Sequence, residues 1–151
     1  MAERGGAMVL KQVSVFLENK SGRLAEVAKV LGENDVDISA LSIADTTDFG
    51  ILRLIVNKPD KAVRVLKDSG FTVGTTDVIA ITVEDQPGGL ATALDTLDRA
   101  KVDIEYMYAF IGNKASGRAM VILRVEDPET AIMTLKENNI DVMPSSEVYR
   151  L

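Results

Sequence analysis

The strongest constraint on how this chain folds is an internal repeat that spans most of its 151 residues. Residues 13–38 align without a gap to residues 79–104, an offset of 66 (79 − 13), and after an insertion near 113–115 the match resumes at an offset of 69 (128 − 59). Solenoid repeats span roughly 20–50 residues, so this longer period indicates the duplication of a whole small domain. The identical pairs are Glu18/Glu84, Gly22/Gly88, Leu24/Leu90, Ala25/Ala91, Leu31/Leu97, Val36/Val102, Asp37/Asp103, Ile38/Ile104, Pro59/Pro128, Ala62/Ala131, Leu66/Leu135, Lys67/Lys136 and Val73/Val142.

Each copy has the pattern of a β-α-β-β-α-β unit. Apolar residues alternate over 13–17 and 79–83, which predicts strands, and then recur at helical spacing over 24–31 and 90–97, which predicts helices. This order is that of the ferredoxin-like arrangement, so we predict an α+β protein with two tandem antiparallel sheets, each carrying its helices on one face. Further strands are predicted at 36–44, 50–56, 102–111 and 118–125, second helices from Pro59 and Pro128, and closing strands from Thr72 and Asp141.

The pattern also predicts the domain boundaries. We expect residues 1–10 to form a flexible lead-in, residues 11–74 the first domain and residues 75–151 the second. Only Gly74–Asp77 separates the last strand of the first copy from the first strand of the second, which is too short for a flexible linker. The two domains are therefore expected to pack together.

The apolar fraction of 46% is high for a chain built from two small domains. Part of this surface is therefore expected to be covered by the neighbouring domain or by other subunits, in a homodimer or a higher homo-oligomer. Tyr106, Tyr108 and Phe110 alternate along one predicted strand. These aromatic side chains would either pack between domains or line a ligand pocket, and the pattern leaves both interpretations open.

The composition argues against several classes of function. The net charge is −6 and no run of Lys or Arg occurs, so nucleic acid is not an expected partner. The sequence has no cysteine and no histidine, which removes thiolate chemistry and the commonest acid–base residue. The first residues lack the apolar stretch of a signal peptide, and no run has the length of a membrane span. A cytoplasmic protein without membrane association is expected.

The same turn occurs in both copies between the first strand and the first helix. It reads LENKSG at 17–22 and VEDQPG at 83–88. A strand that enters a helix through a glycine presents unsatisfied backbone N–H groups to one point, where the helix dipole favours a carboxylate. Asn19 and Asp85 stand just before, where their oxygens could accept hydrogen bonds from an ammonium group. Alternatively, Asn19 and Asp85 only cap the turn, and the glycines only allow the chain to turn, without any ligand.

The stretches VSVFLENKSGRLAEVAKVLGENDVDISALSI and IAITVEDQPGGLATALDTLDRAKVDIEYMYAF each resemble the opening of an ACT domain, a small-molecule-sensing module of amino-acid biosynthetic enzymes. The resemblance extends from Lys11 to the C-terminus, and the first copy departs from the family pattern in having Ser21 where proline is commoner. It implies an amino-acid site where two ACT domains meet, formed by the strand–turn–helix segment of one domain and the second strand of its neighbour. The implied ligand-binding residues are Asn19, Lys20, Ser21, Gly22, Arg23, Leu24, Ile38 and Ser39 in the first copy and Asp85, Gln86, Pro87, Gly88, Gly89, Leu90, Ile104 and Glu105 in the second.

Three functions are compatible with this resemblance. The one we favour is a non-catalytic regulatory protein that senses a small ligand, an amino acid, at interfaces between ACT domains. The first copy also resembles the front of the acetolactate synthase regulatory subunit, in which an LEN-x-SG turn is typical, so a subunit that regulates a biosynthetic enzyme is an alternative. A structural dimerisation module without a ligand is the third.

No other motif points to chemistry. Gly112–Arg118 resembles a phosphate-binding loop in part, but Arg118 replaces its lysine and Ala119 its hydroxyl residue, so we expect a hairpin turn. Glu84 and Asp85 do not belong to a regular array of oxygen ligands and are interpreted as solvated charges. No serine, lysine or aspartate stands in the setting of a nucleophile. We therefore expect no catalysis, no cofactor and no metal.

Overall fold

The computed structural model describes residues 8–18, 22–45, 49–109 and 117–149. The chain forms two compact units, one built mainly from Lys11–Thr76 and the other mainly from Asp77–Val148. They are called here the N-terminal unit and the C-terminal unit, and each is described by itself.

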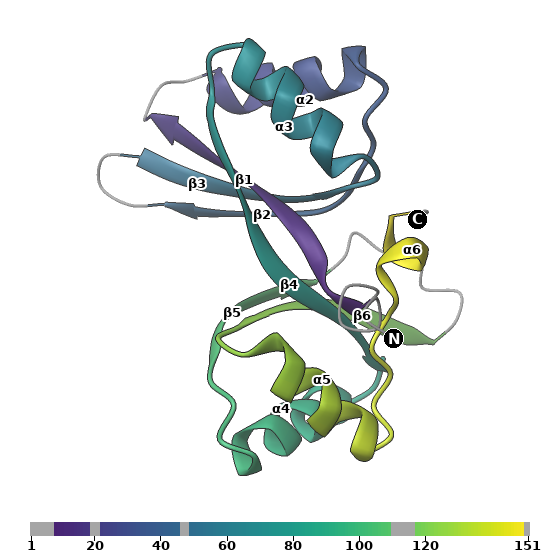
Figure 1. Ribbon diagram of the computed structural model, residues 1–151. Helices are drawn as coiled ribbons and strands as arrows, with labels where there is room; N and C mark the ends of the chain where they lie inside the picture. The colour runs from purple at the N-terminus through teal and green to yellow at the C-terminus, as the bar shows by residue number, and fades with distance from the viewer. Residues whose placement is uncertain (1–7, 19–21, 46–48, 110–116, 150–151) are drawn as a thin grey trace. The chain divides into compact units, whose positions relative to one another are not determined.

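In the N-terminal unit, a sheet carries two helices on one face (Figure 1). The strands lie in the order β2-β3-β1-β4, and β3 pairs antiparallel with both β1 and β2. Val13 and Val15 of β1 face the helices and are fully buried together with Leu31 and Leu66, so the alternating and helical patterns of the sequence meet in one core. The elements are β1 (Leu10–Glu18), α2 (Arg23–Glu33), β2 (Ile38–Asp45), β3 (Phe49–Val56), α3 (Pro59–Asp68) and the beginning of β4 (Thr72–Glu84).

The C-terminal unit repeats this plan. The remainder of β4 pairs antiparallel with β6, which pairs with β5, and two helices cover one face of the sheet (Figure 1). Its core includes the fully buried Ile79, Ile81, Leu97 and Leu135. The elements are α4 (Gly89–Arg99), β5 (Ile104–Ala109), β6 (Arg118–Val125), α5 (Pro128–Glu137) and the short α6 (Ser145–Val148). The predicted α+β, ferredoxin-like fold is confirmed in both copies.

The duplication seen in the sequence also holds for the backbone. Helices α2 and α4 both have 11 residues, and α3 and α5 both have 10. Backbone angles of positive φ recur at matched positions, where the chain leaves a regular element. The matched φ values are 90° at Gly22 and 88° at Gly88, 61° at Asp35 and 60° at Lys101, and 92° at Gly70 and 61° at Asn139.

The structure corrects three predicted elements. The Gly74–Asp77 connector is wrong, because β4 runs unbroken from Thr72 to Glu84 through a threonine-rich stretch that suits an extended chain. The closing strand expected from Asp141 is reduced to one bridge between Val142 and Ile81, since Pro144 follows and α6 begins.

The third correction concerns the second strand of each copy. It begins two residues later than predicted, at Ile38 and Ile104, because the backbone N–H of Val36 still bonds the end of α2 at Leu31 O. The matched Val102 bonds Leu97 O in the same way. Phe110, the third of the alternating aromatics, lies outside the described residues, whereas Tyr106 and Tyr108 are half-buried.

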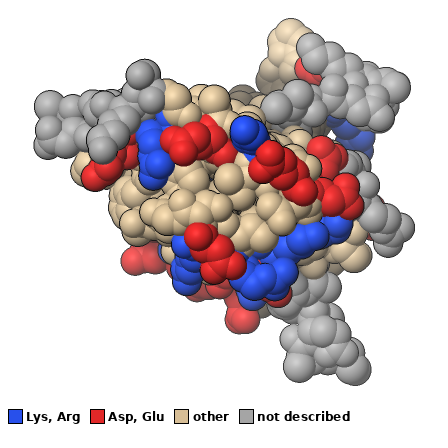
Figure 2. All heavy atoms as spheres, turned by 90° about the horizontal axis from the view of Figure 1, so that it is seen from above, with Lys and Arg blue, Asp and Glu red and all other residues tan. Residues whose placement is uncertain are grey.

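The described helices include none that is long and apolar enough to cross a membrane. On the face shown in Figure 2, basic and acidic side chains lie interspersed rather than gathered by sign. That face therefore does not present the one-signed basic surface that a phosphate backbone requires.

Candidate functional site

The most complete candidate site lies in the C-terminal unit, where β4 turns into α4. Two glycines make this corner possible. Gly88 has φ 88°, a left-handed conformation that other residues adopt at a cost. Gly89 begins the helix against the preceding strand, and a Cβ there would overlap the backbone carbonyl oxygen of Glu84. The backbone of the helix start is therefore packed directly on the end of the strand.

The start of α4 offers backbone N–H groups to a ligand. The first bond within the helix runs from the N–H of Thr92 to Gly88 O at 3.1 Å, and the N–H of Gly89 donates to Gln86 O at 3.0 Å. No side chain of the described residues caps this helix. The amides of Leu90 and Ala91, the next residues of the first turn, therefore point with the positive end of the helix dipole toward the space before the helix, which favours an anionic group there.

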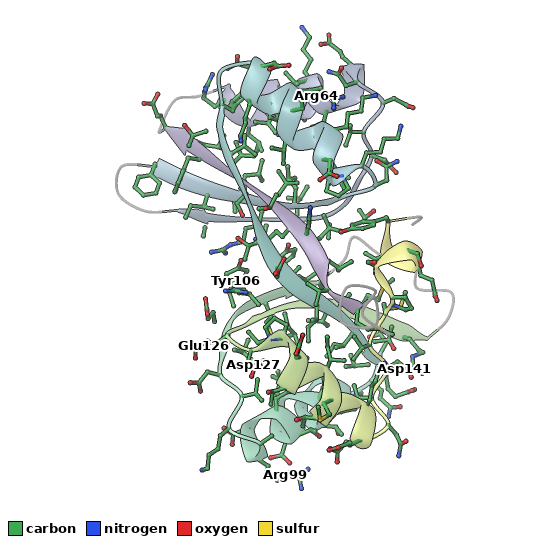
Figure 3. All side chains as sticks on the ribbon, in the orientation of Figure 1. Arg64, Arg99, Tyr106, Glu126, Asp127 and Asp141 are labelled. Atoms are coloured by element: carbon green, nitrogen blue, oxygen red, sulfur yellow. The ribbon has the colours of Figure 1, made fainter. Side chains whose placement is uncertain are left out.

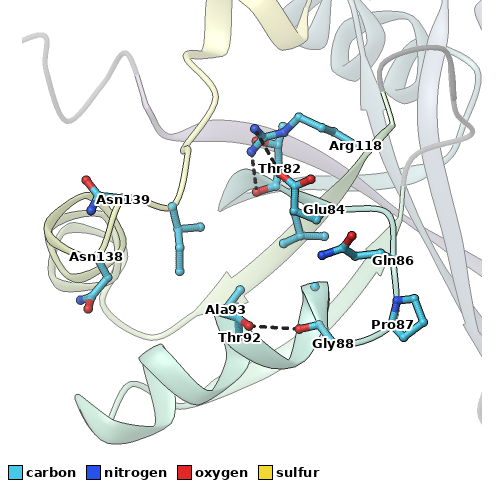
Figure 4. A pocket seen from close by; sticks show the side chains of 13 residues that line it. Thr82, Glu84, Gln86, Pro87, Gly88, Thr92, Ala93, Arg118, Asn138 and Asn139 are labelled. Atoms are coloured by element: carbon cyan, nitrogen blue, oxygen red, sulfur yellow. Dashed lines mark hydrogen bonds and ion pairs between the residues drawn. The ribbon is translucent and has the colours of Figure 1, made fainter.

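A cavity of about 400 Å³ opens at this corner. Figure 4 shows it between the start of α4, the ends of β4 and β6 and the loop that follows α5. Its volume is within the range of small-molecule sites, which is roughly 300–1,000 Å³. The cavity is lined by Thr82, Val83, Glu84, Gln86, Pro87, Gly88, Gly89, Thr92, Ala93, Arg118, Asn138, Asn139 and Ile140.

Arg118 supplies the positive charge of the cavity wall and is held in place by several groups. It is the first residue of β6 and pairs in register with Glu84 of β4. Its Nη2 donates to Thr82 Oγ1 at 2.8 Å and lies 3.2 Å from Asp141 Oδ2, and its Nη1 lies 3.7 Å from Glu84 Oε2. Two carboxylates therefore surround one guanidinium, and the net charge of these three groups is −1.

The opposite wall is the loop that leaves α5. Asn139 has φ 61°, and the backbone N–H of Ile140 bonds back to Leu135 O at 2.9 Å, which ends the helix and brings Ile140 beside the cavity. Asn138 donates its side-chain amide to Thr134 O at 2.8 Å. The cavity thus combines a helix start, an acid–base pair, amide side chains and one apolar wall, a set that suits a small polar molecule with an aliphatic part.

The matched corner of the N-terminal unit repeats the left-handed glycine but has different side chains. Gly22 repeats the left-handed turn, and Arg23 stands where the C-terminal unit has Gly89. The guanidinium carbon of Arg23 lies 4.2 Å from the centre of the Phe71 ring, and its Nη1 lies 3.3 Å from Glu26 Oε1. Phe49, the match of Arg118, packs edge-on against a second phenylalanine, Phe16, with ring centres 5.3 Å apart.

The predicted binding residues fall into three groups. Asn19, Lys20 and Ser21 lie outside the described residues. Gln86, Pro87, Gly88 and Gly89 come together in the cavity wall, whereas the flanking Asp85 and Leu90 do not line it.

The other predicted residues lie elsewhere within their own units. Leu24 is exposed, Ile38 and Ile104 pack against the two cores, and Ser39 is buried. Glu105 pairs with Arg124, with Oε1 and Nε 3.7 Å apart. That the second strand of one ACT domain forms part of the ligand site of a neighbouring domain stays a prediction.

Sequence reasoning missed most of the cavity, nine of its thirteen lining residues. The lining residues that it did not select are Thr82, Val83, Glu84, Thr92, Ala93, Arg118, Asn138, Asn139 and Ile140. The alignment of the two copies carried a signal for Arg118 and Ile140, whose matches are Phe49 and Phe71. The change from an aromatic residue to a charged or a smaller one indicates that this corner has diverged between the copies.

Comparisons with known proteins agree with this fold. A family model described as an ACT domain pair matches residues 8–151. The chain is similar to protein BT0572 from Bacteroides thetaiotaomicron, at 48% identity over 96% of this chain and 99% of that one, with a TM-score of 0.90.

More distant structures share the fold alone. The regulatory subunit of aspartate kinase from Thermus thermophilus, in its ligand-free form, is 14% identical over 87% of this chain and 92% of that one, with a TM-score of 0.61. Aspartokinase III of E. coli in complex with aspartate and ADP is 17% identical over 86% of this chain and 32% of that one, with a TM-score of 0.53. A comparison with curated protein sequences gave no match.

Proposed function

Since this chain belongs to the family of ACT domain pairs, we propose that it is a non-catalytic regulatory protein of the cytoplasm that senses an amino acid through the cavity of its C-terminal unit. The observation that supports the proposal best is the convergence of the start of α4, Glu84 and Arg118 on one cavity of about 400 Å³. The helix start favours the α-carboxylate of the ligand, and Glu84 favours its ammonium group. Both charged ends of an amino acid are then satisfied.

A thermal-shift screen of the full chain against the twenty amino acids tests the proposal. A ligand present at 100 times its Kd adds about 2.7 kcal/mol of stability, which raises the Tm by several degrees. Isothermal titration calorimetry then gives the Kd of the amino acid that produces the shift. If no amino acid shifts the Tm, the sensing proposal is wrong and a structural module is the better interpretation.

Variants of the turn glycines locate the site. Gly88→Val should abolish binding, because a branched side chain resists φ 88° and fills the space before the α4 amides. Gly22→Val, at the matched turn with φ 90°, imposes the same strain and should leave the Kd unchanged. Gly88→Asn keeps a residue that tolerates positive φ and should weaken binding while the chain stays folded. Unchanged affinity in both Gly88 variants would place the ligand elsewhere.

Control of an enzyme is a second candidate role. It is supported by the fold shared with the aspartate kinase regulatory subunit from Thermus thermophilus, of which the match covers 92%. A regulatory subunit should co-purify with a larger enzyme at native expression levels and should lose or gain that association when the amino acid is added. Recovery of the chain solely as a homo-oligomer would count against this role and would leave the sensing proposal intact.

A further inference from the structure

The charged side chains around the C-terminal cavity are few enough to be assigned one by one. Among the described residues, the cavity wall carries one acid, Glu84, and one base, Arg118. A second acid, Asp141, does not line the cavity but reaches Arg118 from outside it, with Asp141 Oδ2 3.2 Å from Arg118 Nη2. The contact between Glu84 and Arg118 is longer, at 3.7 Å. The charge of Arg118 is therefore offset first by Asp141, the carboxylate that stands outside the cavity.

Thr82 holds both members of this ion pair in place. Its hydroxyl accepts a hydrogen bond from Arg118 Nη2 at 2.8 Å, which Figure 4 shows, and its backbone N–H donates to Asp141 O at 3.1 Å. The acid and the base are both missing from the other copy of the repeat, which indicates that they act as a pair. The residues at the three matched positions of the N-terminal unit are Phe16, Phe49 and Thr72.

With Arg118 neutralised from outside, the charges left for a ligand fit the two ends of a zwitterion. Glu84 remains for the ammonium group, and the amides at the start of α4 remain for the α-carboxylate. A basic side chain on the ligand would have to share Glu84 with the ligand's own ammonium group. An acidic side chain would have to compete with Asp141 for Arg118. Either charge would lose hydration in the cavity without gaining a partner of its own, which weakens binding.

We propose that the ligand is an α-amino acid with an uncharged side chain, and that Asp141 excludes acidic amino acids by neutralising Arg118. This assignment rests on the proposed amino-acid site. The side chain of the ligand lies along the apolar part of the cavity wall, which includes Val83, Ala93 and Ile140. Asp141 does not touch the ligand. It acts through Arg118 and is a positioning residue that determines specificity.

Calorimetric titration of the full chain with the amino acids tests the ligand class. The titrations are made at about pH 7.5, where the imidazole of histidine is mostly uncharged. The amino acid of highest affinity should have an uncharged side chain, and L-aspartate, L-glutamate, L-lysine and L-arginine should each bind at least about fivefold more weakly. If one of these four binds as tightly as the best uncharged amino acid, the assignment is overturned.

Asp141→Asn tests how acidic amino acids are excluded. The substitution keeps the size of the side chain and leaves the cavity wall as it is, since Asp141 does not line it. Loss of the carboxylate leaves the charge of Arg118 to the cavity. The affinity for L-aspartate or L-glutamate, measured by competition with the best uncharged amino acid, should rise about fivefold relative to the affinity for that amino acid. The change is small because the side chains of Arg118 and Asp141 are 38% and 68% exposed.

Two further variants separate the role of Asp141 from a general change in charge. Glu137, the exposed last residue of α5, lies next to the cavity wall without lining it and forms no ion pair among the described residues. Glu137→Gln also removes one negative charge and should leave the relative affinity for acidic amino acids unchanged. In the Asp141→Asn background, Arg118→Gln should remove the gain.

Asp141→Ser removes the same charge and replaces Asp141→Asn if asparagine prevents folding, which the Tm of each variant reports. If neither substitution raises the relative affinity for acidic amino acids, the role of Asp141 is wrong. An equal rise in Glu137→Gln would contradict it as well, because the effect would then come from net charge rather than from Arg118.

The outcomes separate this inference from the proposed function. Tight binding of an acidic or basic amino acid that Gly88→Val abolishes would overturn the uncharged assignment and support the amino-acid site. The absence of binding by any amino acid would overturn both. Binding of an uncharged amino acid that depends on Gly88, together with a gain for acidic amino acids in Asp141→Asn, would support both.

Discussion

The two turn corners of this molecule share a left-handed glycine and differ in the side chains around it. Gly22 and Gly88 have φ values of 90° and 88°, and the helices that follow them have equal length. Around this shared turn, the N-terminal unit places an arginine on an aromatic ring, whereas the C-terminal unit has a glycine and a cavity of about 400 Å³. The comparison shows that duplication preserved the left-handed glycine before the helix, while the side chains around it diverged.

The second helices of the two units differ in the same way. Helix α5 is capped by Asp127, whose carboxylate accepts hydrogen bonds from Thr130, whereas Lys58, the residue before α3, makes no side-chain capping bond. Lys58 instead reaches Asp35, with Nζ and Oδ2 3.2 Å apart. The match of Asp35 is Lys101, so the signs of charge at these paired positions are exchanged between the copies. The residue before the second helix therefore caps the helix in one unit and pairs with the loop after the first helix in the other.

The largest effect is expected from giving the C-terminal helix start a side chain. Gly89→Ala should destabilise the protein by about 3 kcal/mol, because its Cβ would overlap the carbonyl oxygen of Glu84 and the backbone must move. The matched Arg23 shows that the N-terminal turn accommodates a long side chain at this position. Urea denaturation measures the change in the free energy of unfolding.

Gly32→Ala is the control for this substitution. Gly32 lies inside α2, and a Cβ there meets nothing within 4 Å, so alanine should stabilise the helix by about 1 kcal/mol. If Gly32→Ala stabilises the protein and Gly89→Ala leaves its stability unchanged, α4 can shift away from β4. The proposed steric difference between the two corners would then be contradicted.

A smaller effect is expected from the pair that fills the N-terminal corner. In a double-mutant cycle with Arg23→Met and Phe71→Leu, the coupling energy should be about 1 kcal/mol, because the guanidinium lies 4.2 Å from the ring centre and its side chain is only 26% exposed. Methionine keeps most of the aliphatic stem, so the cycle isolates the cation–ring contact. Additive losses in urea denaturation would show that Arg23 contributes only packing.

The repeat alone predicted the fold and the position of the corner, for reasons visible in particular residues. Helical spacing and the glycines at 22 and 88 identify where each first helix begins. The resemblance to ACT domains then implied the four residues of the cavity wall that were named, Gln86–Gly89. Arg118 could not, because it reaches Glu84 through the register of two strands 34 residues apart (118 − 84), and a periodic pattern does not determine register by itself.

The two misjudged segments have a related cause. Gly74–Asp77 contains glycine and lacks an apolar alternation, so the pattern separates two strands there, whereas pairing with neighbouring strands keeps the chain extended as one strand from Thr72 to Glu84. The segment from Asp141 looked like a strand, but only Val142 pairs before Pro144 ends the ladder. In both places, tertiary pairing rather than local composition decides the structure.

The smallest effect is expected at the differing starts of the second helices. The Thr130 hydroxyl, at 2.6 Å, and then the Thr130 backbone N–H, at 3.2 Å, donate to the carboxylate of Asp127 and hold its pKa below the ordinary value. Figure 3 shows Asp127 at one end of α5 and Asp141 beyond the other. Because the folded-state pKa is lowered, this stabilisation is present above the unfolded pKa, roughly 3.9, and is lost as the pH falls through the folded value.

Asp127→Ala should therefore lower the Tm slightly at pH 7, and the difference from the unmodified chain should shrink as the pH falls below about 4. Lys58→Ala, the matched position of α3, should show no such convergence, because lysine keeps its charge throughout this range. Asp127→Asn retains an oxygen that can cap the helix and loses the titration, so at pH 7 its Tm should lie between those of the unmodified chain and Asp127→Ala. Its difference from the unmodified chain should change with falling pH as that of Asp127→Ala does, because only the unmodified chain carries the titrating group. A Tm difference for Asp127→Ala that stays constant down to pH 2 would show that its carboxylate charge does not stabilise α5, and the two helix starts would then be equivalent after all.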